Sequence, residues 1–508
     1  MNSRFLLSLA FLLSATAFVA CGGAPQQGPS TPTGESDGQG NDLTEAPPSG
    51  PARDVSFPPV TRTTLPSGLE IHAVEMHQLP VVYFRLVVRS GGETDPEDIP
   101  GLSDLVASML KEGTKNRTSA QIAEEIEFLG ADISTGSGME NLYLSGRTLT
   151  THLDATLDLL ADIVLHPTFP QDELKKLIKR EENELALQEN QPRFLGYREL
   201  YGALYGTHPY GRISTTRDAL KKASRARLQK WHKQHFVPGN ATLVVVGDIT
   251  PAAVEGKVKE LFGPWTGGAV TAPAYPTPPS RDGREIILVD RPESDQSMIY
   301  IGNLALPRGS EDYIPLLVAN QVLGGSATSR LFMDLREKRS LTYGAYSGIG
   351  EMVDTAPFYA SAQVRTEVTG EALGAFFEHL DRIVTEAAPP AELSDAKRFL
   401  TDQFPLQIDT PAPIARMVSD LRIFGLPQDY WDGYRSAIGQ VDAAGALRAA
   451  KTYIHPDQAV VVVVGKATAI LGDLRTLGPV RVVDKKGKTQ GEFTQLPEGG
   501  KAEEKPAH

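Results

Sequence analysis

Cysteine is nearly missing from this chain, which has one, Cys21, among 508 residues. A single cysteine excludes a disulfide framework within the chain and every metal or iron–sulfur site that needs several thiolates. The sequence also lacks an excess of basic residues, because 50 Lys and Arg stand against 63 Asp and Glu for a net charge of −13. With no basic block to neutralise a phosphate backbone, the composition argues against nucleic-acid binding.

The apolar content points to more than one domain. The chain has 508 residues, of which 41% are hydrophobic, and this is more apolar surface than a single core of about 100 to 200 residues can bury. Two or more domains are therefore expected.

The N-terminus has the pattern of an export signal. Residues 5–20 are almost entirely apolar, a run that is short for a membrane-spanning helix and typical of a signal peptide, predicted here over residues 1–20. The order Phe18-Val19-Ala20-Cys21 resembles a bacterial lipobox, in which the cysteine is lipidated, and Gly22 resembles the pattern for outer-membrane delivery. The alternative is an ordinary cleaved signal followed by a chance cysteine.

Two stretches have the composition of flexible chain. Residues 21–55 are rich in Pro, Gly, Ser and Gln and contain no aromatic residue, so we expect a lipidated, flexible tether there. Residues 485–508 are similar and are predicted to be a flexible tail.

The sequence between these stretches contains an internal duplication. Segments of the first part recur in the same order about 212 to 218 positions later, and a repeat this long is a whole domain rather than a solenoid module. The matching pairs are residues 105–108 with 317–320, 129–132 with 341–344, and 236–247 with 454–465. We therefore expect two similar domains, over residues 56–270 and 285–475, joined by a proline-rich linker over residues 271–284.

Hydrophobic periodicity predicts an α+β fold for each unit. Residues 81–89 alternate apolar and polar side chains, as a strand with one buried face does, and residues 298–306 are similar. Valine-rich strands ending at a glycine are expected over residues 244–247 and 460–465. Helical spacing appears over residues 153–164, 171–190, 370–387 and 391–404.

Two further segments carry a resemblance to a known family. Pro100-Gly101-Leu102 leads into an apolar helix, and the second unit contains residues 329–343, SRLFMDLREKRSLTY. Together with the duplication, these segments resemble the insulinase/pitrilysin metallopeptidases over residues 56–475. The resemblance implies two homologous domains of the insulinase/processing-peptidase type, each an antiparallel-rich sheet packed with helices, which form half of a clamshell.

The catalytic motif of that family is degenerate here. Catalytic members carry H-x-x-E-H, in which two histidines bind zinc and the glutamate activates water. The matching positions read Asp104-Leu105-Val106-Ala107-Ser108, and only Glu184 matches the place of the third ligand. Loss of a general base costs about 10² to 10⁴ in rate. We therefore expect neither metal binding by this chain nor hydrolysis by this chain alone.

Other histidines offer little replacement. His232 and His235 have helical i, i+3 spacing, but no carboxylate lies between them, and we interpret them as surface histidines. His208 resembles a loop residue of the family, for which a structural role is expected. A solitary peptidase with a rebuilt metal site stays as one alternative, which metal analysis of the purified protein would test.

The second unit retains a different pair. Some two-subunit family members have one zinc-bearing subunit and one partner that keeps an arginine and a tyrosine, and Arg330 and Tyr343 are matched to that pair. The resemblance implies that both contact substrate near the scissile bond, where a guanidinium and a phenol donate hydrogen bonds to a carbonyl or an oxyanion. The alternative is that Arg330 forms a salt bridge and Tyr343 packs at a strand edge.

These expectations combine into one hypothesis. The chain is predicted to be the non-zinc subunit of a heterodimeric insulinase-like peptidase, with zinc in the partner subunit and no cofactor of its own. An extended peptide substrate would add a strand to an exposed sheet edge. The lipid on Cys21 would anchor the protein to the bacterial outer membrane, facing the periplasm. The alternative is a non-enzymatic peptide-binding or scaffold protein derived from the same fold.

Overall fold

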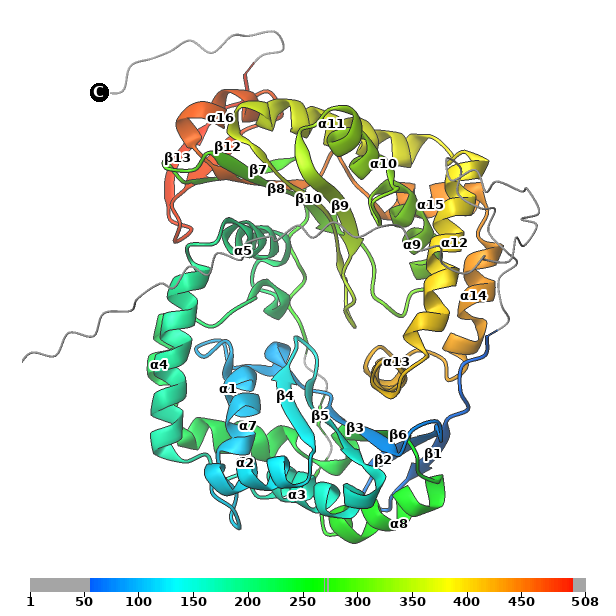
Figure 1. Cartoon of the computed structure of the whole chain (residues 1–508). Coiled ribbons are helices and arrows are strands. Elements are labelled where there is room, and N and C mark those ends of the chain that lie inside the picture. Colours follow the sequence, from blue (N-terminus) through cyan, green and yellow to red (C-terminus); the bar gives the residue numbers. More distant parts are fainter. Residues whose placement is uncertain (1–54, 269, 272–273, 497–508) are drawn as a thin grey trace, which may run out of the picture. The chain divides into compact units, whose positions relative to one another are not determined.

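The computed structural model describes residues 55–268, 270–271 and 274–496, which form two α+β halves, each built on one mixed sheet (Figure 1). The predicted signal peptide, Cys21 and the predicted tether up to residue 54 lie outside the described residues. The expected fold class, two α+β domains with sheets packed by helices, is confirmed. The predicted helices match α3, α4, α11 and α12 to within a few residues.

The first sheet has six strands in the order β1-β2-β6-β3-β5-β4. β2 pairs with β6 in parallel, and every other neighbouring pair is antiparallel. The alternation read from residues 81–89 produces β3, in which alternate side chains are fully buried. The strands are β1 (Thr61–Thr64), β2 (Glu70–Glu75), β3 (Val81–Val88), β4 (Asp132–Ser137), β5 (Leu142–Leu149) and β6 (Ala241–Gly247).

The second sheet repeats this topology and extends it. Its order is β13-β12-β7-β11-β8-β10-β9, so β7-β11-β8-β10-β9 repeats β2-β6-β3-β5-β4 with the same pairing directions. The duplication seen in the sequence is therefore also a duplication of strand order. The strands are β7 (Glu285–Asp290), β8 (Gln296–Leu304), β9 (Thr342–Ile349), β10 (Pro357–Arg365), β11 (Val460–Gly465), β12 (Val480–Val483) and β13 (Thr489–Phe493).

The C-terminal segment corrects one prediction. Residues 485–496 are not a flexible tail, because β13 pairs antiparallel with β12, and β12 continues the sheet beyond β7. A tight turn joins β12 to β13: the Asp484 carboxylate accepts from the amides of Lys486 and Lys488, and Gly487 has a positive φ of 78°. A composition rich in Lys, Gly and Gln hid this hairpin, which extends the second half beyond residue 475.

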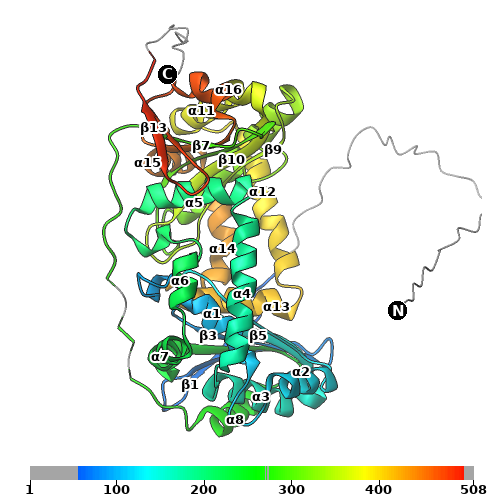
Figure 2. The ribbon, with the colours of Figure 1, turned by 90° about the vertical axis from the view of Figure 1, so that its left-hand side faces the viewer.

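The helices of the first half lie mainly on one face of its sheet. α2, α3 and α8 lie together on one side of the strands in both ribbon views (Figures 1 and 2). α2 begins with a capping box, in which the Thr118 side chain accepts from the Gln121 amide and the Gln121 side chain accepts from the Thr118 amide. The helices are α1 (Leu102–Met109), α2 (Ser119–Phe128), α3 (Leu153–Leu165), α4 (Gln171–Gln188), α5 (Pro192–Tyr205), α6 (Arg217–Lys222), α7 (Arg225–His235) and α8 (Pro251–Phe262).

The second half is also rich in helices, one of which is unusual. The short helix α10 passes directly into π-helical turns over Met333–Lys338, a geometry that is rare and frequent at functional sites. The helices are α9 (Tyr313–Leu323), α10 (Arg330–Phe332), α11 (Thr369–Thr385), α12 (Pro390–Gln407), α13 (Pro411–Ile423), α14 (Tyr430–Gln440), α15 (Ala443–Tyr453) and α16 (Ala467–Leu474). Within the described part of the chain, no helix has both the length and the apolar character needed to cross a bilayer.

The two halves exchange a helix. α5 of the first half packs on β8 and β11 of the second sheet, and α13 of the second half packs on β3 and β6 of the first sheet. Gly196 allows the close approach of α5, because a Cβ there would lie 2.7 Å from the Tyr300 ring. Both faces of β6 and β11 are consequently covered, which explains why these valine-rich strands are buried at every position.

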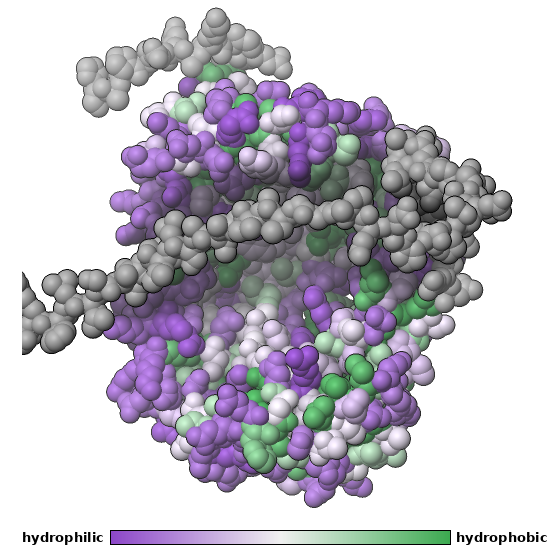
Figure 3. Space-filling model, viewed as in Figure 1, coloured by the Kyte–Doolittle hydropathy of each residue, from purple (hydrophilic) through white to green (hydrophobic). Residues whose placement is uncertain are grey.

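The surface is mixed in polarity. The face shown in Figure 3 is largely hydrophilic, with hydrophobic residues scattered over it in small groups. Large apolar side chains that are exposed include Phe128, Leu187 and Leu406. Single exposed apolar residues of this kind are normal for folded proteins.

Candidate functional site

The start of α1 is fixed by a buried carboxylate. Asp95 accepts hydrogen bonds from the amides of Gly101 and Ser103, at 2.8 Å each, and from the Ser103 hydroxyl. Burial raises the pKa of Asp95 to about 7. Gly101 has a φ of 86°, and a Cβ at this position would lie 2.8 Å from Cβ of Thr215. The glycine of the motif is therefore required by backbone geometry as well as by space.

The degenerate motif lines a pocket between α1 and α4. Asp104 and Ser108 lie one helical turn apart on α1, and Glu181 and Glu184 approach from α4. The structure thus brings together three of the four predicted positions, Asp104, Ser108 and Glu184. The fourth, Ala107, is 1% exposed and packs in the core of the first half.

The electrostatics of this pocket are acidic. The surrounding protein and the negative charge of Glu181 raise the pKa of Asp104 to about 6, although the Asp104 side chain remains accessible to solvent. Glu184 is exposed, and its Oε1 accepts from Nε2 of Gln188 at 3.3 Å. Carboxylates and hydroxyls line the pocket together with apolar residues such as Leu105 and Ile213.

These donors do not fit a catalytic zinc ion. Such sites need three protein ligands among which imidazole is prominent, and the pocket provides no imidazole. In the residues that the structure describes, no group of three or more His, Cys, Asp or Glu side chains is arranged to hold a metal ion. Ala107 has no group that can accept a proton from water, so this pocket has no general base at the motif position.

The histidine pair of α7 is not the surface pair that the sequence predicts. Nε2 of His232 lies 2.9 Å from the carbonyl oxygen of Val164, and Nδ1 of His235 lies 2.9 Å from Oγ of Ser90. Burial lowers the pKa of both histidines to about 4. Each ring is therefore partly buried and contacts a different partner, Val164 of α3 for His232 and Ser90 for His235.

His208 has a structural environment. It is 1% exposed, its Nδ1 accepts from the Tyr210 amide at 3.1 Å, and its ring packs against those of Tyr205, Tyr210 and Tyr275. It caps the 3₁₀ turn that follows α5. This arrangement agrees with the structural role expected from the sequence.

Tyr343 and Arg330 occupy different environments. Tyr343 lies on β9, the edge strand of the second sheet, and its residue is 89% exposed. The Arg330 side chain is 5% exposed, and its Nε donates to Oε2 of Glu392 on α12 at 2.7 Å. No hydrogen bond joins the two residues in the described structure. The salt-bridge alternative therefore describes Arg330 correctly, whereas Tyr343 points into solvent and does not pack at the strand edge.

A different arginine accompanies Tyr343. Nη1 of Arg336 donates to the carbonyl oxygen of Tyr343 at 3.2 Å, and its guanidinium lies 4.9 Å from the centre of the Phe332 ring. The sequence interpretation overlooked Arg336, which lies seven residues before Tyr343 within the same motif. The π-helical turns of Met333–Lys338 bring it to this position.

The edge strands β4 and β9 are each partly occupied. On β4, Nζ of Lys111 donates to the carbonyl oxygen of Ile133 at 2.6 Å, and α1 lies beside this strand. On β9, the amide of Ser347 donates to the carbonyl oxygen of Gly324 at 2.9 Å. With the Tyr343 carbonyl bonded to Arg336 as well, β9 has more occupied main-chain groups than β4, whose remaining outer edge offers main-chain groups to an added strand.

Comparisons with known proteins follow the same two halves. Residues 71–216 match the family model described as insulinase (peptidase family M16), and residues 222–400 match the model described as peptidase M16 inactive domain. An uncharacterized zinc protease of Bacillus subtilis is 28% identical over 290 residues, covering 57% of this chain and 69% of that protein. An uncharacterized zinc protease of Mycobacterium leprae is 25% identical over 342 residues, covering 66% and 76%.

Two solved structures have similar folds. The peptidase M16 inactive domain from Pseudomonas fluorescens superposes with a TM-score of 0.76 at 27% identity, covering 80% of this chain and 98% of that chain. A protease from Helicobacter pylori gives a TM-score of 0.76 at 20% identity, covering 80% and 100%. At this lower identity the likeness concerns the fold alone.

Proposed function

Because the chain belongs to the insulinase family of peptidases, we propose that it is the non-zinc subunit of a heterodimeric peptidase and binds extended peptides for a zinc-bearing partner. One observation carries this proposal. The motif pocket on α1 keeps the glycine turn but has neither imidazoles nor the base, while the second half carries the exposed Tyr343 and an arginine, Arg336, that binds the Tyr343 backbone carbonyl.

The two exposed donors have a clear chemical use. The phenol of Tyr343 and the guanidinium of Arg336 donate hydrogen bonds and carry no basic lone pair that competes for a proton at neutral pH. Directed at a peptide carbonyl oxygen, they stabilise the negative charge that develops when the carbonyl is attacked. One such donor contributes about 10² to 10³ in turnover. Zinc, held by the partner subunit, would supply the Lewis acid in this scheme.

Arg330 takes a positioning role in the proposal. Its ion pair with Glu392 ties α10 to α12, and the π-helical turns that carry Arg336 begin three residues later. The Arg330 side chain is buried, whereas Arg336 and Tyr343 are exposed. We therefore assign substrate contact to Arg336 and Tyr343.

Peptide binding is proposed at the edge of β4. This strand borders α1 and the degenerate pocket, and it ends its sheet on that side. An extended peptide that adds to β4 gains main-chain hydrogen bonds with little dependence on side-chain identity. The shallow, polar pocket formed by Asp95, Asp104, Ser137 and Arg212 adjoins this edge and offers contacts to one or two peptide side chains.

Location and partner are inferred from the sequence. We propose lipidation at Cys21 and attachment to the outer membrane with the folded part in the periplasm. The partner is a zinc-bearing subunit of the same family. Cys21 itself lies outside the described residues.

Co-expression with a zinc-bearing insulinase-family subunit from the same genome tests the proposal. The pair is expected to hydrolyse an unfolded fluorogenic peptide, and this chain alone is not. Tyr343→Phe and Arg336→Ala should each lower kcat by about 10² while changing KM little. Tyr346→Phe, a matched change on the same strand, should leave kcat unchanged.

The outcomes separate the candidate functions. Wild-type kcat in both Tyr343→Phe and Arg336→Ala removes the donor role. Tight peptide binding without hydrolysis in any pairing favours the non-enzymatic binding protein. Stoichiometric zinc and cleavage by the isolated chain would overturn the proposal.

A further inference from the structure

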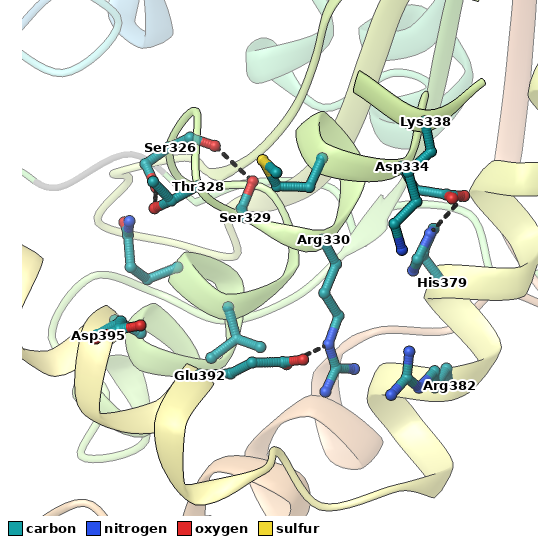
Figure 4. Close-up of a pocket in the computed structure, with 14 residues that line it drawn as sticks. Ser326, Thr328, Ser329, Arg330, Asp334, Lys338, His379, Arg382, Glu392 and Asp395 are labelled. Atoms are coloured by element: carbon teal, nitrogen blue, oxygen red, sulfur yellow. Dashed lines mark hydrogen bonds and ion pairs between the residues drawn. The ribbon is translucent and has the colours of Figure 1, made fainter. Parts of the chain in front are cut away.

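A second pocket lies in the other half of the molecule, away from the α1 pocket. It is lined by α9, the loop before α10, the π-helical turns, α11 and α12 (Figure 4). The residues that matter for its chemistry are Ser326, Thr328, Arg330, Lys338, Arg382 and Glu392. Its volume, about 210 Å³, suits a small polar group and not a folded segment.

Arg330 is incompletely satisfied in this pocket. Its side chain is 5% exposed, and Nε has a partner in Glu392, but Nη1 and Nη2 are buried and have no hydrogen-bond partner. Two unmet guanidinium nitrogens cost more than two ordinary unpaired donors, because the group is charged. The unmet capacity consists entirely of donors, so it calls for an acceptor.

The charges around Arg330 are mixed, so the preference for an anionic acceptor comes from the two unpaired nitrogens of Arg330 itself. Figure 4 shows the end of the Arg330 side chain lying between Glu392 and Arg382, and Lys338 lines the same pocket. Among the acids, Glu392 is already bonded to Arg330, and Asp334 is paired with His379 and Arg339. Asp395 stands on the Glu392 side and is the one lining carboxylate of the described residues without a hydrogen bond or ion pair.

Hydroxyl groups complete the lining. Oγ of Ser326 and Oγ1 of Thr328 lie 3.1 Å apart and share one hydrogen bond, which leaves the other hydroxyl proton available to a ligand. Oγ of Ser329 is occupied, since it donates to the carbonyl oxygen of Ser326 at 2.6 Å. The pocket therefore combines a fixed guanidinium with a free hydroxyl donor.

We propose that this pocket binds a small oxyanion, a carboxylate or a phosphate, through Nη1 and Nη2 of Arg330. Two parallel N–H groups on one guanidinium match two oxygens of such a group in a bidentate arrangement. Lys338 adds positive charge, Arg382 lies nearby with its Nε bonded to Glu386, and the Ser326/Thr328 pair adds one donor. The site goes beyond the proposed peptidase role and does not depend on it.

Titration calorimetry on the full chain at low ionic strength tests this site. The probes are inorganic phosphate in one arm and a short peptide with a free C-terminal carboxylate in the other, with the amidated peptide as its control. We expect saturable 1:1 binding in at least one arm. Binding of phosphate alone identifies a phosphate site, and binding of the free-acid peptide alone identifies a carboxylate site.

Variants locate the binding. Arg330→Lys keeps the positive charge and the partner Glu392 but loses the fork, and it should weaken binding at least tenfold. Lys338→Gln, a change of an exposed side chain that the fold tolerates, should weaken binding about threefold and reduce its salt dependence. Arg365→Lys, at an exposed arginine on β10, should bind as wild type does. Absence of binding in both arms, or wild-type affinity in Arg330→Lys, overturns the site.

Discussion

Replacing Glu140 by glutamine is expected to change how the stability of the protein depends on pH. Glu140 lies in the turn between β4 and β5 and is 8% exposed. Its Oε1 accepts from the Tyr210 hydroxyl and, at 2.6 Å, from the Val353 amide of the other half. Burial, with a smaller contribution from the charge of Asp354, raises its pKa from 4.5 to about 7. Glutamine keeps the accepting oxygen and removes the titration.

The size and the sign of the effect follow from that shift. Between pH 4.5 and 7 the folded protein holds a proton on Glu140 that the unfolded chain has released, so stability falls as pH rises through this window. A pKa change from 4.5 to about 7 corresponds to about 3 kcal/mol, fully lost above pH 7. The loss is absent in Glu140→Gln. Burial also raises the pKa of the neighbouring Glu93 to about 8, and the negative charge of Glu140 contributes to this rise. Glu140→Gln removes that charge, so the pKa of Glu93 falls and the stability at high pH increases further.

Thermal unfolding at pH 5, 6, 7 and 8 measures this difference. The difference in unfolding midpoint between Glu140→Gln and wild type should rise by about 3 to 6 °C from pH 5 to pH 8. About 3 kcal/mol gives the lower value if both halves unfold together and the higher value if one half unfolds alone. Glu97→Gln, at an exposed glutamate of the same half, should show no such trend. A midpoint difference that is constant across this range would refute a proton held at Glu140.

Two structural contacts give further predictions. Asp162→Ala removes a 4%-exposed carboxylate that accepts from three side chains, so it should lower the free energy of unfolding measured in urea by about 3 to 5 kcal/mol. Asp158→Ala, at the 57%-exposed partner of the same Arg117, should lower it by less than about 1 kcal/mol. Equal losses in the two variants would contradict this. Gly146→Ala would place a Cβ 1.8 Å from a backbone oxygen of β4 and should loosen that edge strand in hydrogen exchange, while Gly256→Ala on α8, where nothing lies within 4 Å, should be neutral or stabilising by up to about 1 kcal/mol; unchanged protection of β4 amides in Gly146→Ala would argue against the clash.

Hydrophobic periodicity predicts which segments form strands and helices, but it does not predict which of these elements pack against each other. The valine runs that end at Gly247 and Gly465 are strands, as predicted, because β-branched residues on both faces suit a strand that is covered on both sides. The sequence pattern is the same whichever helix provides the cover. The exchange of α5 and α13 between the halves therefore could not be read from it. The β12–β13 hairpin was missed because its polar residues meet water on an exposed edge.

The candidate site divides in a similar way. Spacing on α1 correctly brings Asp104 and Ser108 to one face, and Glu184 joins them from α4. The sequence could not predict where the side chains of Arg330 and Arg336 lie, because π-helical turns change the direction in which successive side chains leave the backbone. The burial of His232 and His235 depends on contacts with Val164 and Ser90, which are distant in sequence.

Because α5 and α13 each pack on the sheet of the other half, neither half can cover its sheet alone. A fragment that ended in the segment joining the halves would contain the first sheet with Val244 and Val246 open to water, because Ile414 and Val418, which cover them, are encoded far downstream. The complementary fragment would bare Val462 and Val464 in the same way. Neither sheet would have a sealed core, so the repeat would behave in synthesis and in degradation as one cooperative body.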